Sequence, residues 1–274
     1  MSLIADIRTL WQLAFAPIEG ETHEARLESF YGAQAAGYDS FRRRLLRGRE
    51  ELVGRLQFPA GGVWIDVGGG TGANLQFAGK ALQALSHVYI VDLCRPLLAV
   101  AGKRIREKGW KNVSTLQADA TTFFPPERAD VITFSYSLTM MPDWFAAIDR
   151  ARAALKPGGM IGIVDFYLSR KHAGQGRVQH GWLTRSLLPL WFGADNVFLS
   201  ADHLPYLLQR FEPVFVAERR GRIPYLPLAT APYYIFCGRP RTSEVTQKAL
   251  CGAAQGCSTV VGQPWEMQSW MREP

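Results

Sequence analysis

Residues 63–74 read VWIDVGGGTGAN, and this stretch decides the fold. Its first five residues are apolar apart from Asp66, and they predict a short buried strand. Glycines then follow at positions 68, 69, 70 and 72. Glycine adopts turn conformations that other residues avoid, and its bare backbone lets a ligand come close. The stretch therefore predicts a strand, a tight turn and a ligand site before the next helix.

The same rhythm continues along the chain. After a helix expected over residues 73–85, apolar β-branched segments alternate with helical ones, and the motif KPGG at 156–159 is expected to end a helix. This alternation is typical of a mostly parallel sheet with helices on both faces. We predict an α/β protein with a Rossmann-like, seven-stranded sheet. The expected strands are residues 63–67, 87–93, 113–119, 129–137, 160–167, 212–220 and 232–240.

Three regions depart from this rhythm. Residues 1–56 predict an N-terminal helical extension or cap, which begins with an amphipathic helix. Within the main domain, residues 57–241, the segment 168–210 is rich in Trp, Leu, Pro and His. We expect that segment to be a helical insertion, a lid, after the fifth strand. Residues 242–274 are rich in Ser, Thr, Gln and Gly and predict a loosely packed tail.

The chain is basic, with a formal net charge of +7 and 24 arginines against seven lysines. Five of the arginines fall in the stretch RRRLLRGRE at 42–50. The planar guanidinium suits phosphate or carboxylate groups, so this cluster favours an acidic ligand or an anionic surface. Nucleic acid is not expected as a partner, because the arginines are not interleaved with the aromatic residues of a strand-binding groove.

The cysteines and the N-terminus indicate the compartment. The four cysteines form no CxxC pair and have no histidine partners at metal-ligand spacing. We therefore expect reduced thiols, a cytoplasmic protein and no metal site. The N-terminus has neither the basic region nor the cleavage site of a signal peptide. No stretch approaches the roughly 18 apolar residues of a membrane span.

In an open α/β sheet, ligands bind beyond the carboxyl ends of the strands. Three predicted strands end in acids, namely Asp66, Asp92 and Asp119. Each acid alone has a second explanation as a helix N-cap, but the three in register favour a ligand site. The pattern Gly68-x-Gly70-x-x-Ala73 also fits a dinucleotide, so NAD remains an alternative. A P-loop is excluded because no Gly-Lys-Ser/Thr follows.

Asp66 favours S-adenosylmethionine over NAD. A pyrophosphate at a helix N-terminus gains nothing from a neighbouring carboxylate. An α-amino group does gain, through a charge-assisted hydrogen bond that is direct or mediated by water. Asp119 in turn suits the exocyclic amine of adenine. The predicted cofactor is therefore S-adenosylmethionine.

The motifs DVGGGTGANL, VDL, QADATTF and KPGG resemble those of class I S-adenosylmethionine-dependent methyltransferases. The flanking blocks HEARLESFYGAQAAGYDSFRRRLLRGRE, GWKNV, SYSLTMMPDWF, IGIVDFY and PYYIFCGR resemble the methyltransferase component of betaine-lipid synthase. This resemblance covers residues 23–240. It implies methylation of diacylglyceryl-homoserine to diacylglyceryl-N,N,N-trimethylhomoserine. A separate enzyme would then have to supply the homoserine lipid.

The resemblance also implies roles for individual residues. The glycine loop would hold the methionine half, Asp92 the ribose and Asp119 the adenine edge, while N-terminal residues close over the cofactor. The implied cofactor-binding residues are Tyr31, Tyr38, Arg47, Asp66, Gly68, Gly70, Gly72, Asp92, Leu93, Asp119, Ala120 and Ser135. For Tyr31 and Tyr38, ordinary packing in an amphipathic helix is the alternative.

Methyl transfer to an amine leaves a positive charge on nitrogen, which aromatic faces stabilise. The candidate catalytic residues are Tyr136, Tyr167 and Tyr233, with Asp165 as an electrostatic partner. Tyr206 is a weaker candidate, and Tyr234 is expected in the core. Successive strand residues point to opposite faces, so Tyr233 and Tyr234 cannot share one pocket.

A lipid substrate keeps its acyl chains in the membrane. We therefore expect peripheral attachment to the inner, anionic face of a membrane through the N-terminal helix, the arginine cluster and residues 182–192. Three alternatives remain open. The first is a methyltransferase with another acceptor, such as phosphatidylethanolamine or a quinone precursor. The second is an NAD-dependent oxidoreductase. The third is a non-catalytic relative that only binds membranes or nucleic acid.

Overall fold

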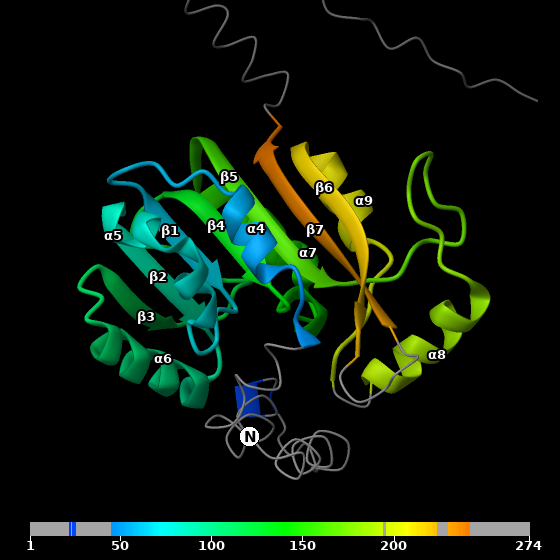
Figure 1. Ribbon diagram of the computed structural model, residues 1–274, viewed down its shortest axis with the longest axis horizontal. Helices are drawn as coiled ribbons and strands as arrows, with labels where there is room; N and C mark the ends of the chain where they lie inside the picture. The colour runs from blue at the N-terminus through cyan, green and yellow to red at the C-terminus, as the bar shows by residue number, and fades with distance from the viewer. Residues whose placement is uncertain (1–21, 23, 26–44, 194–195, 224–229, 242–274) are drawn as a thin grey trace, which may run out of the picture. The chain divides into compact units, whose positions relative to one another are not determined.

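A computed structural model describes residues 22, 24–25, 45–193, 196–223 and 230–241 (Figure 1). Its seven strands form one sheet in the order β3-β2-β1-β4-β5-β7-β6. Strands β1 to β5 are parallel, and β7 runs antiparallel to both β5 and β6. This confirms the predicted fold class. The strands are β1 (Val63–Val67), β2 (His87–Asp92), β3 (Val113–Gln117), β4 (Ala129–Ser135), β5 (Leu155–Phe166), β6 (Phe211–Arg222) and β7 (Thr230–Pro240).

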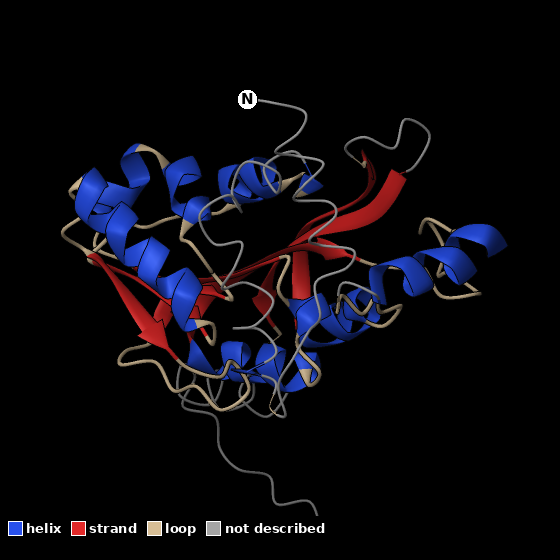
Figure 2. Ribbon diagram, turned by 90° about the horizontal axis from the view of Figure 1, so that it is seen from below, coloured by secondary structure: helices blue, strands red, loops and turns tan. Residues whose placement is uncertain are grey.

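Helices cover both faces of the sheet, as Figure 2 shows. Apolar side chains from α4, α5 and α6 join one buried cluster, and those from α7 and α9 join the cluster on the opposite face. The central strand β1 is buried on both sides, which is why it reads as a nearly continuous apolar run. The helices are α4 (Arg49–Arg55), η1 (Ala73–Ala78), α5 (Lys80–Ala84), α6 (Arg95–Lys108), η2 (Leu138–Met140), α7 (Trp144–Ala154), α8 (Trp182–Gly193) and α9 (His203–Arg210).

Two local expectations were wrong. The single helix expected over 73–85 is a 3-10 helix, η1, followed by the short α5. Gly79 separates them, because its φ of 53° and ψ of −126° interrupt the helix. The strand expected over 160–167 begins earlier, because β5 already starts at Leu155 and contains the KPGG motif, while α7 ends at Ala154, just before that motif as expected. The pairing of Ala129 with Leu155, before a register shift, extends the strand to this point.

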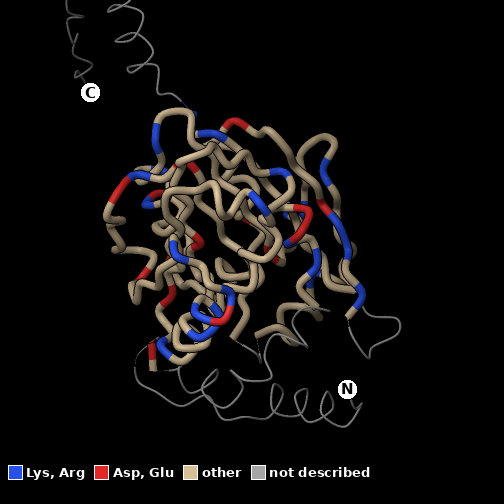
Figure 3. The backbone as a smooth tube through the Cα atoms, turned by 60° about the vertical axis from the view of Figure 1, so that its left-hand side comes forward, with Lys and Arg blue, Asp and Glu red and all other residues tan. Residues whose placement is uncertain are grey.

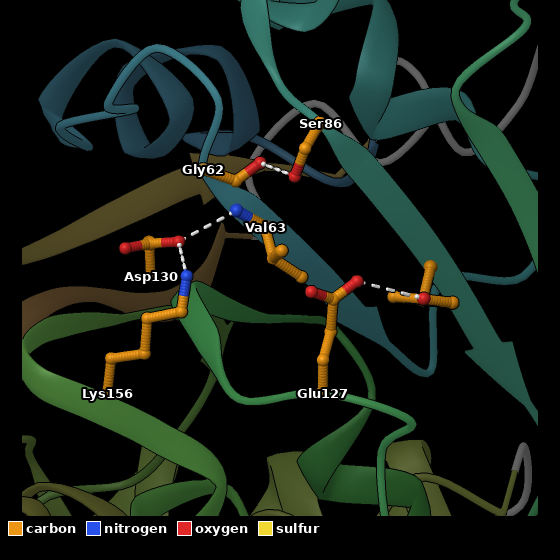
Figure 4. Close-up of polar contacts among 7 residues, drawn as sticks. Gly62, Val63, Ser86, Glu127, Asp130 and Lys156 are labelled. Carbon is orange, nitrogen blue, oxygen red and sulfur yellow. Dashed lines mark hydrogen bonds and ion pairs between the residues drawn. The ribbon is translucent and has the colours of Figure 1, made fainter.

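The amino ends of β1, β4 and β5 are tied together by Asp130 (Figure 4). The Asp130 carboxylate accepts a hydrogen bond from the Val63 amide at 2.8 Å and pairs with Lys156 Nζ at 2.7 Å. Burial opposes ionisation, but these two bonds hold the pKa of Asp130 below its usual value. Nearby, Ser86 Oγ donates to the carbonyl of Gly62. These contacts fix the end of the sheet opposite to the strand ends where ligands bind.

Helix α4 packs directly on β5. A Cβ added at Gly162 would lie 2.7 Å from Leu56 Cδ2 and 3.1 Å from Leu52 Cδ1, so the bare backbone is what allows the approach. This contact places the start of α4, at Arg49, near the carboxyl ends of the strands. Contacts divide the chain into a unit of residues 1–240 and a unit of residues 241–274. Most of the predicted N-terminal extension and the predicted tail lie outside the described residues.

The described residues of the predicted insertion at 168–210 form two helices, α8 and α9. Figure 1 shows α8 beside the ends of β6 and β7 rather than over the sheet. None of the helices among the described residues is long and apolar enough to cross a membrane.

Candidate functional site

A cavity of about 270 Å³ lies at the carboxyl ends of β1, β2, β3 and β4. The loops after these four strands line it together with the start of α4. This is where ligands bind in open α/β sheets. The lining residues used below are Arg49, Gly68, Gly70, Asn74, Asp92, Leu93, Asp119, Ala120, Ser135, Tyr136 and Ser137.

The glycine loop after β1 is shaped by positive φ angles. Gly68 and Gly70 both line the cavity, with φ of 65° and 53°. A Cβ at Gly68 would lie 2.3 Å from Ser137 Cβ, so only glycine fits there. Gly72 does not line the cavity; its Cβ would meet Ile90 Cδ1 at 2.7 Å. The structure therefore places two of the three predicted glycines at the ligand site and the third against the sheet.

Asp92 lies at the end of β2 and lines the cavity with Leu93. Its Oδ2 accepts a hydrogen bond from the Gly70 amide and its Oδ1 accepts one from the Cys94 amide, each at 2.8 Å. A carboxylate oxygen has two lone pairs and can accept more than one hydrogen bond. Asp92 thus fixes the glycine loop and offers acceptors to the cavity.

Asp119 and Ala120 follow β3 and line the next part of the cavity. Asp119 Oδ1 accepts hydrogen bonds from the amide and the hydroxyl of Thr121, at 2.8 and 2.7 Å. These bonds orient the carboxylate in a short turn after the strand. The predicted acids of β2 and β3 therefore converge on one cavity.

Asp66 is placed differently from its prediction. Its side chain is fully buried and does not line the cavity. Thr133 Oγ1 donates to its Oδ1 at 2.6 Å, and Thr133 in turn accepts a hydrogen bond from Trp64 Nε1. Burial raises the pKa of Asp66 to about 6, against the opposing effect of its hydrogen bonds.

Asn74 connects Asp66 with the cavity. Its Nδ2 donates to Asp66 Oδ2 at 3.1 Å, and its side chain, only 6% exposed, lines the cavity. Among the described residues, Asn74 Oδ1 is buried without a hydrogen-bond partner. Sequence reasoning missed Asn74, although it ends the stretch that decides the fold. Its signal is a polar amide on the first turn after the glycines.

At the start of α4, Arg49 lines the cavity and Arg47 does not. The Arg47 carbonyl accepts a hydrogen bond from the Tyr136 hydroxyl at 2.6 Å. The side chain of Arg47 lies near Gly221. Arg49 Nε donates to the Leu46 carbonyl. Arg49 is therefore the described arginine of the predicted cluster that reaches the site. Tyr31 and Tyr38 lie outside the described residues.

Ser135 and Tyr136 line the cavity where β4 ends. Ser135 Oγ is buried and has no hydrogen-bond partner among the residues described. Tyr136 has a φ of 54°, which is rare for a residue other than glycine. Its ring packs on Phe166, and burial raises the pKa of its hydroxyl well above the usual value. Tyr136 thus presents a neutral aromatic ring rather than a base.

The other predicted catalytic residues do not line the cavity. Asp165 is fully buried and accepts bonds from the amides of Leu138, Thr139 and Phe166 and from Thr139 Oγ1, which anchors η2. Burial raises its pKa to about 7. Tyr167 donates to Glu218, so its hydroxyl points away from the site.

The two tyrosines of β7 lie on opposite faces, as strand alternation requires. Tyr233 belongs to the core cluster that contains Tyr136, and Tyr234 belongs to the cluster on the other face. Tyr206 donates to Asp149 on α7, away from the cavity. Of the four tyrosines considered for catalysis, Tyr136 is the one that lines the cavity, and Tyr234 lies in the core as expected.

Residues 38–211 match the family described as "Methyltransferase domain". The chain belongs to this family, which confirms the predicted class, an S-adenosylmethionine-dependent methyltransferase. Among curated proteins, it is 27% identical over 147 residues to a demethylmenaquinone methyltransferase of Geobacillus kaustophilus, and 28% identical over 159 residues to the ubiquinone/menaquinone biosynthesis C-methyltransferase UbiE of Vibrio vulnificus. These matches cover 51% and 56% of this chain and 62% and 61% of those proteins. The chain thus spans about six-tenths of the length of these relatives.

Among solved structures, the fold is similar to the N-methyltransferase NodS from Bradyrhizobium japonicum in complex with S-adenosyl-L-homocysteine. The TM-score is 0.58 at 16% identity, and the match covers 79% of this chain and 99% of NodS. At this identity the similarity supports the fold alone.

Proposed function

We propose that this protein transfers methyl groups from S-adenosylmethionine to the amino group of a membrane lipid, with diacylglyceryl-homoserine as the acceptor. The observation that carries the proposal is the composition of the cavity. It combines acceptors for an amino acid and a nucleoside with a neutral aromatic ring, and its described lining contains no histidine, lysine or cysteine.

The described residues fit the cofactor. Asn74 Oδ1 is a buried acceptor that has no donor among the described residues. We propose that it accepts a hydrogen bond from the cofactor's ammonium group. Arg49, Asp92 and Asp119 line the cavity, and we assign them to the carboxylate, the ribose hydroxyls and the adenine amine. At Gly70, a Cβ would meet its nearest neighbour at 3.6 Å, so the backbone there is open toward the cavity. Bare backbone of this kind allows a ligand to approach closely.

S-adenosylmethionine supplies an electrophilic methyl group when bound. The chain must deliver an unprotonated amine in line with it, although free amines are mostly protonated at neutral pH. Removal of water lowers an amine pKa, and alignment supplies several kcal/mol. A dedicated base is therefore not required. The Tyr136 ring, held by its hydroxyl's bond to the Arg47 carbonyl, is suited to face the ammonium that forms.

Two further arguments support a lipid amine. The flanking sequence blocks resemble the methyltransferase of betaine-lipid synthesis, and their match is longer than the glycine loop that all class I enzymes share. A quaternary ammonium product carries a permanent charge, which a neutral aromatic wall stabilises without trapping it through hydrogen bonds. A separate enzyme would supply the homoserine lipid.

The test is a transfer assay with purified protein and S-adenosylmethionine labelled in its methyl group. Mixed micelles contain diacylglyceryl-homoserine, phosphatidylethanolamine or a demethylated quinone precursor, and mass spectrometry counts the methyl groups in each product. We expect transfer to the homoserine lipid up to the trimethylated product, and no transfer by Gly70→Arg. Transfer to the quinone precursor alone would overturn the proposal.

The quinone precursor is the second candidate. It is favoured by the names of the curated relatives, a demethylmenaquinone methyltransferase and a ubiquinone/menaquinone biosynthesis C-methyltransferase. Carbon methylation needs a base to activate the aromatic acceptor. Asp143 is a lining carboxylate to which the cofactor assignment gives no role, and it would be the candidate base.

A further inference from the structure

Helix α8 presents large apolar side chains to solvent. Its twelve residues contain a single charged side chain, Arg185. Isolated surface apolar residues are ordinary, but a contiguous group marks an interaction site. Five such residues are between 42% and 75% exposed: Trp182, Leu183, Leu187, Leu190 and Trp191.

The two faces of α8 have different roles. Phe192 is buried against Phe166, with ring centroids 4.9 Å apart, and Leu188 packs on the same core. Leu183, Leu187 and Leu190 are spaced by four and three residues, so they share another face of the helix. The inward residues already attach α8 to the domain. The outward leucines are therefore not needed for the core.

The loop of residues 169–180, which precedes α8, is fixed by hydrogen bonds and an ion pair. The Ser169 amide donates to His180 Nδ1 at 3.0 Å, and the His180 amide donates to Ser169 Oγ at 2.7 Å. Glu218 of β6 also accepts a hydrogen bond from the Val178 amide and pairs with Arg177. These contacts close the loop that precedes α8. The helix is thus held in position with its apolar face outward.

Residues 168–193 contain Arg170, Lys171, Arg177 and Arg185 but no Asp or Glu. Arg170 pairs with Asp202 and Arg177 pairs with Glu218, so the net positive charge of this segment comes from Lys171 and Arg185. In the described chain as a whole, Figure 3 shows Lys and Arg on many segments rather than in one stripe. An apolar helix face in an acid-free, basic segment is complementary to a lipid surface that is apolar inside and anionic outside.

We propose that the outward face of α8 inserts into the headgroup region of an anionic bilayer and brings the cavity to its lipid substrate. This inference rests on the proposed lipid acceptor. Trp182 and Trp191 stand at the two ends of the helix, where their amphipathic rings suit the membrane–water interface. The helix lies in the surface rather than across the membrane, since its length excludes a span.

Co-flotation with vesicles tests the proposal. Full-length protein is mixed with phosphatidylcholine–phosphatidylglycerol vesicles and with pure phosphatidylcholine vesicles. The variant Leu187→Ser/Leu190→Ser removes outward apolar groups, and Val214→Ser, at a 54% exposed position on β6, is the matched control. We expect wild type and control to float with the anionic vesicles. The double variant should partition at least roughly tenfold less, because each leucine loses the free energy of leaving water.

Two parallel measurements separate the possible failures. All variants should keep their melting temperature and their affinity for S-adenosylmethionine, because none alters the core or the cavity. Transfer to a short-chain, water-soluble homoserine glycerolipid should also be unchanged, while transfer to the same headgroup in vesicles falls. Equal flotation of wild type and double variant overturns the α8 proposal. So does a change of oligomeric state without vesicle binding, which would identify a second copy as the occupant. Flotation without transfer to either acceptor would instead overturn the proposed function.

Discussion

Asn74 Nδ2 donates a hydrogen bond to Oδ2 of the buried Asp66, at 3.1 Å. This bond decides which side of the amide is available, since it commits the nitrogen to Asp66 and leaves Oδ1 without a partner in the described part of the chain. Asp66, the acid of the glycine motif, therefore acts on the cavity through Asn74 rather than directly. It orients an amide, and the amide offers a neutral acceptor.

Replacement of this amide should weaken cofactor binding. In Asn74→Ala, the affinity for S-adenosylhomocysteine should fall roughly 10- to 100-fold, because a hydrogen bond to a charged group contributes about 1.5–3 kcal/mol. Isothermal titration calorimetry measures the dissociation constant. Gln179→Ala removes an exposed amide outside the cavity lining and should leave affinity unchanged. Unaltered affinity in Asn74→Ala would show that the ammonium binds elsewhere.

Gly70→Arg should abolish cofactor binding without unfolding the protein. The control is Gly109→Arg, because Gly109 also has a positive φ, of 64°, has nothing within 4 Å of an added Cβ and does not line the cavity. A residue other than glycine in this left-handed conformation costs about 1–2 kcal/mol. Both variants should stay folded in thermal melts, while calorimetry should detect binding by Gly109→Arg alone. Binding by Gly70→Arg would exclude this cavity as the cofactor site.

The ring of Tyr136, rather than its hydroxyl, should matter for transfer. Tyr136→Phe keeps the aromatic face and should retain kcat within about threefold, whereas Tyr136→Leu should lose roughly 10-fold, since a desolvated cation–π contact contributes about 1–2 kcal/mol. Initial rates with the homoserine lipid give kcat and KM. The loss should be largest for the third methyl transfer, whose product has a permanent charge. Equal loss in both variants would instead assign the role to the hydroxyl.

His203 should make the fold sensitive to acid. It is fully buried between Trp144 and Tyr234, and burial lowers its pKa from 6.5 to about 4. Because the unfolded chain binds this proton first, the stability that depends on neutral His203 is lost as pH falls from 6.5 toward 4. From pH 7 to pH 5 the loss is roughly 2 kcal/mol. Asp66 and Asp165 act in the opposite sense, since their raised pKa values remove stability as pH rises through about 6 and 7.

His203→Leu isolates this contribution, because the two buried acids are unchanged in it. Between pH 7 and pH 5, the free energy of unfolding of His203→Leu should change more favourably than that of wild type, by roughly 2 kcal/mol, and denaturant melts at the two pH values measure this difference. The control His172→Leu replaces an exposed histidine and should follow wild type. Parallel curves for wild type and His203→Leu would contradict the assignment.

The sheet could be predicted from the sequence because the central parallel strands β1, β4 and β5 are buried on both faces and read as apolar runs. The acids Asp92 and Asp119 were found for a related reason, since the carboxyl ends of neighbouring strands meet at one edge. Pattern alone did not separate Arg47 from Arg49. Both belong to one basic cluster, and which of them reaches the cavity depends on where α4 begins on β5.

Asp66 and Asp165 show a second limit. Both are acids at or near the carboxyl end of a strand, which is the signal for a ligand. Both are instead fully buried and bonded to the protein itself. An acid within a strand points to one face of the sheet, whereas an acid one residue later can lie in the turn that follows. How deeply each side chain is buried depends on the packing around it, which the spacing of acids in the sequence does not show.

The reciprocal bonds between Ser169 and His180 close residues 169–180 into a loop whose ends lie side by side, just before α8. A loop whose ends already meet can be lengthened, shortened or exchanged without displacing β5 before it or α8 after it. The surface that this loop presents can therefore change while α8 and the cofactor cavity keep their positions.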